Sequence, residues 1–208
     1  MPTSDSSQSL SAADLTDRFW EGRYQEGTAR WDLGQPAPVF VSLLNSPDAP
    51  QPGRMAVLGS GRGHDALLFA EHGFEVVGFD FAPSAIEAAR TNAQQRGLSA
   101  EFLQRDIFGL DAEFAQQFDY VLEHTCYCAI APEQRTDYVK LVRAILRPQG
   151  ELIGLFWAHS RPGGPPFGTT PDAIRQRFAE FELIAATLVS NSVEGRKGEE
   201  YLMRFRKP

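Results

Sequence analysis

The chain has 208 residues, of which 42% are hydrophobic and 23% charged, the composition of an ordinary globular protein. This length suits one domain with its own core, so we expect a single domain over residues 14–208. The 20 basic and 27 acidic residues give a formal net charge of -7, and no basic run is present. Such a charge repels a nucleic-acid backbone, which argues against a nucleic-acid partner.

Targeting signals are not evident in the sequence. Residues 1–13 are rich in Ser, Asp and Gln and have neither a basic start nor an apolar stretch, which predicts a mobile tail rather than a secretion signal. The longest apolar run, 152–158, is far shorter than the roughly 20 residues of a membrane span. Cys126 and Cys128 lie one residue apart, a spacing that strains a bridge. We therefore expect a soluble, cytoplasmic protein with reduced thiols and no membrane partner.

The predicted elements begin with an amphipathic helix over 13–25, because Leu15, Phe19 and Trp20 recur at helical spacing, and a short apolar helix follows around 39–44. From Met55 onward, short apolar runs alternate with helical segments, which is typical of βα units and a mainly parallel sheet. The expected strands lie near 55–58, 75–79, 100–103, 118–122 and 150–157, and the expected helices near 63–72, 84–96 and 133–146. The segments 181–190 and 199–206 predict an antiparallel hairpin.

A glycine loop follows the first predicted strand, in the segment 57–65, Val-Leu-Gly-Ser-Gly-Arg-Gly-His-Asp. Glycines permit a tight turn and a close approach of backbone amides to a ligand beyond the carboxyl ends of the strands. A dinucleotide loop would place its third glycine at position 64, which is His64 here. The glycines at Gly59, Gly61 and Gly63 therefore favour S-adenosylmethionine over NAD.

Acidic residues follow the next two predicted strands. Asp80 ends the strand 75–79, where its carboxylate would accept hydrogen bonds from both ribose hydroxyls of an adenosine. At the end of the third strand, Asp106 would accept a hydrogen bond from the adenine amino group and Ile107 would lie against the ring. Three successive strand ends would then line one nucleoside ligand. The alternative is that the glycines only shape a turn and the acids cap helices.

With these motifs the chain resembles class I methyltransferases, and more narrowly the thiopurine methyltransferase-like group that includes halide and thiol methyltransferases. The resemblance runs from Phe19 over nearly the whole chain. Its most specific stretches are Trp20, 31–36, 59–65, 123–130 and 163–168. It implies a single Rossmann-like α/β domain with a mostly parallel seven-stranded sheet that ends in an antiparallel hairpin.

The resemblance also implies S-adenosylmethionine as cofactor and a lid over residues 14–50. In this family tryptophans before the glycine loop fold over the cofactor, and aromatic faces attract a sulfonium cation. The predicted cofactor-binding residues are Trp20, Trp31, Gly59, Gly61, Gly63, Asp80, Phe81, Asp106, Ile107, Glu123 and His124. In halide and thiol enzymes the segment after the fourth strand usually reads Asp-Tyr-Thr-Phe-Phe-Cys-Ala, and residues 123–129 match it in part.

Methyl transfer to an anionic thiolate or halide needs orientation and desolvation more than acid–base help. A neutral thiol would have to lose its proton, and His124 is the side chain best matched to accept it at neutral pH. The alternative is that His124 faces the cofactor and forms hydrogen bonds without taking part in proton transfer. We predict His124 and Tyr127 as catalytic residues. Trp20, Trp157 and Phe167 are further candidates for the pocket wall, each with core packing as its alternative.

The predicted acceptor is therefore a small soft nucleophile: a thiol, bisulfide or halide. Oxygen, nitrogen and metalloid acceptors stay open, as does a noncatalytic protein that binds S-adenosylmethionine. Cys126 and Cys128 would touch a soft substrate or be buried free thiols. No metal site is expected, because the four histidines are scattered and the cysteines lack a second pair. We expect a monomer or a small homo-oligomer.

Overall fold

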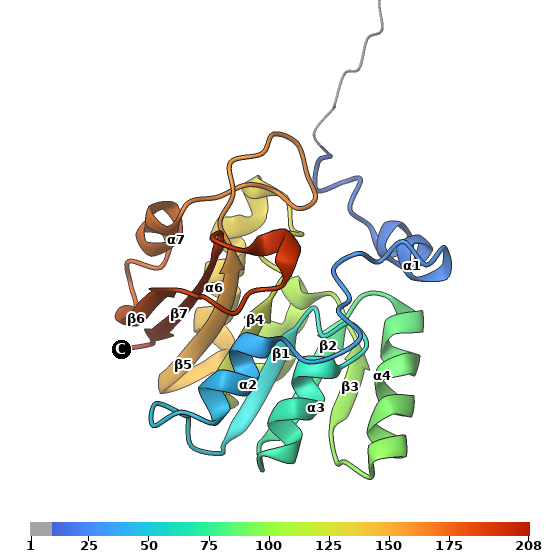
Figure 1. The fold of residues 1–208 in the computed structure, drawn as a ribbon, viewed down its shortest axis with the longest axis horizontal. Coiled ribbons are helices and arrows are strands. Elements are labelled where there is room, and N and C mark those ends of the chain that lie inside the picture. The colour runs from blue at the N-terminus through green and yellow to red at the C-terminus, as the bar shows by residue number, and fades with distance from the viewer. Residues whose placement is uncertain (1–9) are drawn as a thin grey trace, which may run out of the picture.

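Seven strands form one sheet in the computed structural model, which describes residues 10–208, and their order is β3-β2-β1-β4-β5-β7-β6 (Figure 1). The first five strands are parallel, and β7 runs antiparallel to both β5 and β6. This arrangement confirms the predicted fold class and the C-terminal hairpin. The strands are β1 (Arg54–Leu58), β2 (Glu75–Asp80), β3 (Glu101–Gln104), β4 (Phe118–His124), β5 (Leu146–Trp157), β6 (Glu182–Leu188) and β7 (Glu200–Arg206).

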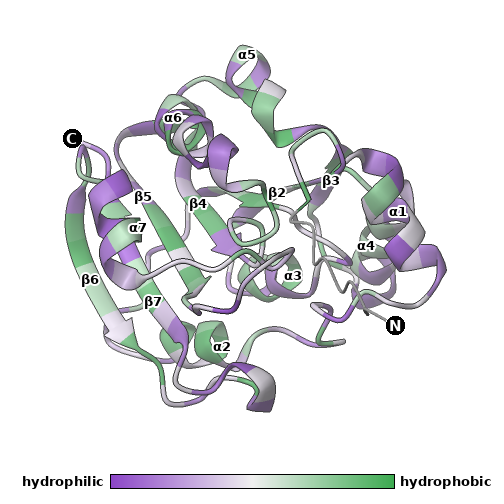
Figure 2. Cartoon of the chain, turned by 90° about the horizontal axis from the view of Figure 1, so that it is seen from above, coloured by the Kyte–Doolittle hydropathy of each residue, from purple (hydrophilic) through white to green (hydrophobic). Residues whose placement is uncertain are grey.

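Helices cover both faces of the sheet, because the side chains of a strand alternate between its faces. In β1, Ala56 and Leu58 join one hydrophobic cluster, whereas Met55 and Val57 join the other. The first cluster is completed by α5 (Leu110–Phe114), α6 (Arg135–Ile145) and α7 (Pro171–Arg177), and the second by α2 (Pro38–Leu44), α3 (His64–Glu71) and α4 (Pro83–Arg96). The central strands are hydrophobic along most of their length (Figure 2).

The first helix, α1 (Asp17–Gln25), starts later than predicted. Thr16 is its N-cap and accepts a hydrogen bond from the backbone N–H of Phe19 at 3.3 Å. A capping side chain satisfies one of the donors that a helix leaves free at its N-terminus, which fixes the start. The helix lies above the carboxyl ends of the strands, on the side of α4 (Figure 1).

The structure differs from the predictions in other boundaries and in two short helices. β4 extends to His124, so this residue ends the strand instead of following it, and β5 begins at Leu146 rather than near 150. The helices α5 and α7 were not predicted, because each is short and has only one buried side chain, Leu110 in α5 and Ile174 in α7, which leaves no apolar period to recognise. The one-turn 3-10 helices are η1 (Ile107–Gly109), η2 (Pro132–Gln134) and η3 (Glu194–Arg196).

The first nine residues of the predicted mobile tail lie outside the described residues. Of the remainder, Ala12 donates its backbone N–H to Glu133 at 3.2 Å, and Leu10 packs against the cluster that contains Leu15 and Phe167. In residues 10–208 no helix is both long and apolar enough to cross a membrane.

Candidate active site

A cavity of about 1160 Å³ opens at the carboxyl ends of the parallel strands. Ligand cavities commonly measure about 300–1,000 Å³, so this one has room for a nucleoside cofactor and a second small molecule. Seven predicted cofactor-binding residues line it, namely Trp20, Trp31, Gly59, Asp80, Phe81, Asp106 and Ile107. The structure thus brings together the ends of β1, β2 and β3 with the segment around α1.

The glycine loop lies between β1 and α3. Gly63 is the N-cap of α3 with φ +81°, and a Cβ there would lie 2.9 Å from the Phe102 ring. Only glycine meets both demands, the left-handed backbone and the close approach. Gly59 has φ +62° and faces Cys126 across the floor of the cavity. Gly61 and Gly63 are not among the described residues that line the cavity, and their positive φ angles shape the turn.

Asp80 is the acid at the end of β2, and its side chain is held by the backbone around it. One carboxylate oxygen accepts the N–H of Gly61 at 2.8 Å and the other accepts the N–H of Ala82 at 2.9 Å. Burial raises the pKa of Asp80, against these hydrogen bonds, which lower it. Each oxygen keeps a further lone pair, and Asp80 lines the cavity, so two ribose hydroxyls have acceptors there.

Three aromatic side chains form the cover of this part of the cavity. Trp31 contacts Trp20 and Tyr24 edge to face, with ring centroids 5.3 and 5.5 Å apart. The Trp31 indole N–H donates to the Tyr24 hydroxyl at 3.1 Å. Burial raises the pKa of Tyr24 above its usual range, so the hydroxyl stays neutral. The cover thus has fixed orientations and presents π faces and one hydroxyl.

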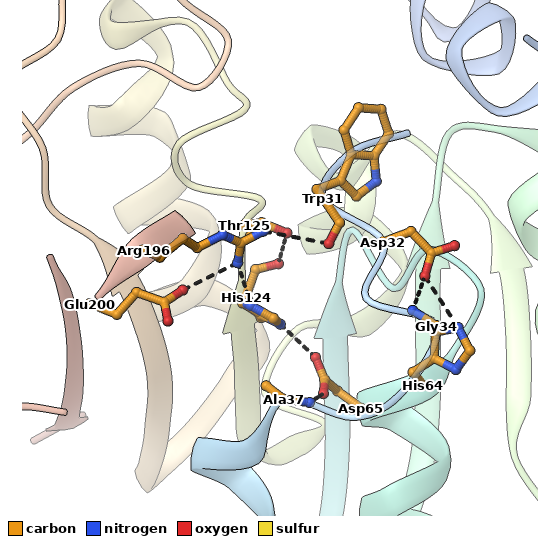
Figure 3. A network of polar contacts seen from close by, with 10 residues as sticks. All are labelled: Trp31, Asp32, Gly34, Ala37, His64, Asp65, His124, Thr125, Arg196 and Glu200. Carbon is orange, nitrogen blue, oxygen red and sulfur yellow. Dashed lines mark hydrogen bonds and ion pairs between the residues drawn. The ribbon is translucent and has the colours of Figure 1, made fainter. Parts of the chain in front are cut away.

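The motif at residues 31–36 is tied to α3 through Asp32. Its carboxylate contacts His64 Nε2 at 3.2 Å and accepts the N–H of Gly34 at 2.9 Å (Figure 3). It also forms an ion pair with Arg62 at 3.1 Å. His64 occupies the position where a dinucleotide loop would carry its third glycine. Here the side chain at that position holds the aromatic cover to the body of the protein.

His124 is clamped between two charged side chains (Figure 3). Its Nδ1 contacts Asp65 at 2.7 Å and its Nε2 contacts the Arg196 guanidinium at 3.0 Å. A guanidinium can only donate, so Nε2 accepts and Nδ1 carries the proton that it donates to Asp65. His124 is not among the described residues that line the cavity. The predicted catalytic and cofactor-binding roles stay predictions, and the geometry shows a ring that holds Arg196.

Arg196 lines the cavity although it is 5% exposed, and the sequence reasoning missed it. It forms a buried ion pair with Glu200 at 3.2 Å and lies over the Trp157 ring, 5.0 Å from its centroid. Its Nη2 donates to the Trp31 carbonyl at 3.5 Å. Arg196 and Lys197 form a short basic pair between Gly195 and Gly198 that carries no periodic signal, which is why the pattern did not reveal Arg196.

Glu123 and Tyr127 lie in the core beside the cavity. Glu123 accepts the N–H of Tyr127 at 2.8 Å and the hydroxyl of Tyr138 at 2.6 Å. Burial raises the pKa of Glu123 to about 7. Tyr127 is 1% exposed, and the guanidinium of Arg135 lies 4.7 Å from its ring centroid. Neither residue lines the cavity in the described chain, so a cofactor contact of Glu123 and a catalytic role of Tyr127 stay predictions.

Cys126 and Cys128 are free thiols in the turn after β4, and both line the cavity. Burial raises the pKa of Cys126 well above its usual value and that of Cys128 to about 12, so both stay protonated at neutral pH. Of the other proposed wall residues, Trp157 lines the cavity, whereas Phe167 is buried behind Pro165 and Pro166, which do line it. Residues 10–208 hold no group of three side chains suited to a metal ion.

A glycine loop and two acids at the ends of three neighbouring parallel strands, followed by an antiparallel hairpin, are the features of the class I S-adenosylmethionine-dependent methyltransferases. The chain belongs to the thiopurine S-methyltransferase (TPMT) family, whose model matches residues 15–202. It is thus a methyltransferase that uses S-adenosylmethionine.

Similar proteins carry several related activities in their names. The probable thiol methyltransferase 2 of Arabidopsis thaliana is 32% identical over 193 residues, which cover 90% of this chain and 84% of that protein. Thiocyanate methyltransferase 1 of Brassica oleracea is 33% identical over 196 residues, with the same coverage. The 1,6-didemethyltoxoflavin-N1-methyltransferase of Burkholderia thailandensis, solved with S-adenosylhomocysteine, has a TM-score of 0.75 and 22% identity, and the match covers 94% of this chain and 88% of that one.

Proposed function

We propose that this protein transfers the methyl group of S-adenosylmethionine to a small soft nucleophile, a thiol first, with bisulfide and halide ions as further acceptors. The observation that carries this proposal is the chemistry of the cavity lining outside the predicted cofactor-binding residues. Apolar and aromatic side chains line it, among them Ile130, Trp157, Pro165 and Val193, together with the cation of Arg196. The names of the similar thiol and thiocyanate methyltransferases support the same acceptor class.

S-adenosylmethionine supplies a methyl group on a positively charged sulfur, which leaves as the thioether of S-adenosylhomocysteine. In this chain, Asp80 would hold the ribose hydroxyls and Asp106 with Ile107 the adenine. Trp20, Tyr24 and Trp31 would cover the sulfonium with aromatic faces, which attract a cation and exclude water. These assignments fit the observed orientation of the carboxylate and the rings.

The acceptor would react as the thiolate, because both ring nitrogens of His124 already have partners and the Arg196 guanidinium at the wall is paired with Glu200. The thiol proton would go to solvent before the sulfur attacks the methyl carbon. The apolar walls strip water from the sulfur and hold it in line. His124 acts by fixing Arg196.

Formation of S-adenosylhomocysteine with matched acceptor pairs tests this proposal. Thiophenol against phenol, and bisulfide and iodide against chloride, separate soft from hard nucleophiles of similar size. We expect saturable turnover on sulfur, weaker turnover on iodide, and none on phenol. Turnover on phenol or an amine but not on sulfur would overturn the acceptor class. Tight cofactor binding with no turnover would instead indicate a noncatalytic S-adenosylmethionine-binding protein.

We also propose that the protein acts in the cytoplasm, as a monomer or a small homo-oligomer. The two unpaired thiols support a reducing compartment. Light scattering coupled to size exclusion gives the oligomeric state, and fractionation of the source cells gives the location.

A further inference from the structure

The helix α1 forms part of the cavity wall, with Trp20 and Tyr24 facing inward. On one side, Phe19 and Trp20 pack against the cluster that contains Leu15, Ala131 and Phe167. On the side of α4, Tyr24 packs against only two small side chains, Ala82 and Ala85, and a polar interaction adds to this contact.

That interaction comes from Glu21, on the α4 side of α1. One Glu21 oxygen accepts the backbone N–H of Ser84 at 3.0 Å, and the other makes a short hydrogen bond with the Ser84 hydroxyl. Gln25, one turn further along α1, donates its amide to the same carboxylate at 2.8 Å and so holds its rotamer.

The N-terminus of α4 needs this carboxylate. Its N-cap is Ala82, which has no capping side chain, and its first residue, Pro83, has no N–H. Of the remaining donors in this turn, the N–H of Ala82 goes to Asp80 and that of Ser84 goes to Glu21. Two carboxylates therefore cap α4 together: Asp80 at the end of β2 and Glu21 on α1. The helix dipole favours a negative charge at both positions.

We propose that Glu21 is a positioning residue for cofactor retention: by capping α4 in trans it locks α1, and with it Trp20 and Tyr24, over bound S-adenosylmethionine. The lock uses a charge-assisted hydrogen bond to a helix N-terminus, so it depends on the ionised carboxylate and not on the shape of the side chain. This inference rests on the cofactor site and does not depend on which acceptor is methylated.

Glu21→Gln tests the lock, because it keeps the size of the side chain and removes its charge. We expect S-adenosylmethionine and S-adenosylhomocysteine to dissociate about fivefold faster, the factor that corresponds to the loss of one charge-assisted hydrogen bond. The rate is followed by tryptophan fluorescence after a chase with excess competing ligand. Ser84→Ala, which keeps the backbone contact, should give a smaller increase, and the double variant should be less than additive.

Glu26→Gln is the matched control, since it removes the same charge at the end of α1 from an exposed residue whose side chain has no partner among the described residues. Its dissociation rate should equal that of the wild type. Trypsin cleavage at Arg18 and Arg23 gives a second readout, because bound ligand should protect both sites in the wild type and less in Glu21→Gln. An unchanged dissociation rate in Glu21→Gln, or an equal change in Glu26→Gln, overturns the proposal. Both readouts need only the cofactor, so a failed acceptor assay leaves this test intact.

Discussion

Asp80 has four acceptor sites on its two oxygens, and backbone N–H groups already take two of them. Asp80 lines the cavity, so the remaining two would be available to ribose hydroxyls. In Asp80→Asn an NH₂ group replaces one carboxylate oxygen. This group cannot accept a hydrogen bond from the backbone N–H or from a ribose hydroxyl, so both the glycine loop and the ligand lose an acceptor. We expect S-adenosylhomocysteine to bind about tenfold more weakly or worse by calorimetry. Asp48→Asn, at an exposed site, should bind normally, and unchanged affinity in Asp80→Asn would refute the ribose assignment.

Gly63 combines a positive φ with a crowded neighbour, whereas Gly97 has a similar φ of +64° and nothing within 4 Å of its virtual Cβ. Gly97→Ala should therefore lower the free energy of unfolding only by the cost of a left-handed backbone at a non-glycine residue, about 1 kcal/mol. Gly63→Ala adds a clash with the buried Phe102 ring and should cost roughly 1–3 kcal/mol more. Urea denaturation of both variants measures the difference. Equal free energies of unfolding would show that the Phe102 contact relaxes without cost.

Glu123 gives the protein a pH-dependent stability. Burial raises its pKa from 4.5 to about 7, so the folded state binds this proton more tightly than the unfolded state. The stabilisation that comes from the protonated Glu123 is fully present below about pH 4.5 and is lost as the pH rises through about 7. Glu123→Gln mimics the protonated acid, since its oxygen can accept from Tyr127 and its amide can donate to Tyr138.

The stability of Glu123→Gln relative to wild type should therefore rise by up to about 3 kcal/mol between pH 5 and 8. Urea titrations of both proteins at each pH give this difference, in which the other titrating groups cancel. A difference that stays constant with pH would mean that Glu123 titrates alike in both states.

At the scale of elements, a polar chain joins four segments that are remote in sequence. Ala37, at the N-cap of α2, donates to Asp65 on α3; Asp65 holds His124 on β4, and His124 accepts from Arg196, which is paired with Glu200 on β7. The side chains of Arg196 and Glu200 are only 6% and 3% exposed. Removal of one partner would leave a buried charge without compensation.

Arg196→Met should therefore destabilise the protein by about 3–5 kcal/mol, and the double variant Arg196→Met with Glu200→Gln should recover much of the loss. Lys197→Met is the neighbouring control: its ion pair with Glu194 is exposed, so the loss should stay below about 1 kcal/mol. Denaturant unfolding of the three variants decides. A similar loss in Lys197→Met would point to the η3 segment as a whole rather than to the buried pair.

Sequence reasoning found the parts of the site that follow a rule of the fold. Gly59, Asp80 and Asp106 each follow a strand of a parallel sheet, and parallel strands place their carboxyl ends on one edge. Arg196 reaches His124 across 72 residues, and such a contact has no counterpart in periodicity or in local spacing. The short helices α5 and α7 were missed for a related reason, since tertiary packing rather than their own pattern decides that they form.

At the scale of the whole molecule, one sheet separates two hydrophobic clusters that share its strands. We therefore predict one cooperative thermal transition, as the proposed single domain requires. S-adenosylhomocysteine at about 100 times its Kd should raise the free energy of unfolding by about 2.7 kcal/mol. For a chain of this size, this corresponds to an increase in Tm of roughly 5–10 °C. NAD at the same concentration should leave Tm unchanged. Two separated transitions, or an equal shift with NAD, would contradict the single domain or the cofactor.

The cavity is assembled from distant parts of the chain: Gly59, Asp80 and Ile107 come early, Cys126 follows β4, and the wall at Arg196 is held in place by β7, which lies between β5 and β6. A chain that grows on the ribosome thus contains the predicted adenosine-binding residues long before it can close the acceptor side. A polypeptide truncated ahead of Glu194 would still carry the glycine loop and Asp80, yet it would lack the charged wall. Because β7 pairs with both β5 and β6, premature termination late in translation should yield fragments that cannot complete the sheet and cannot methylate.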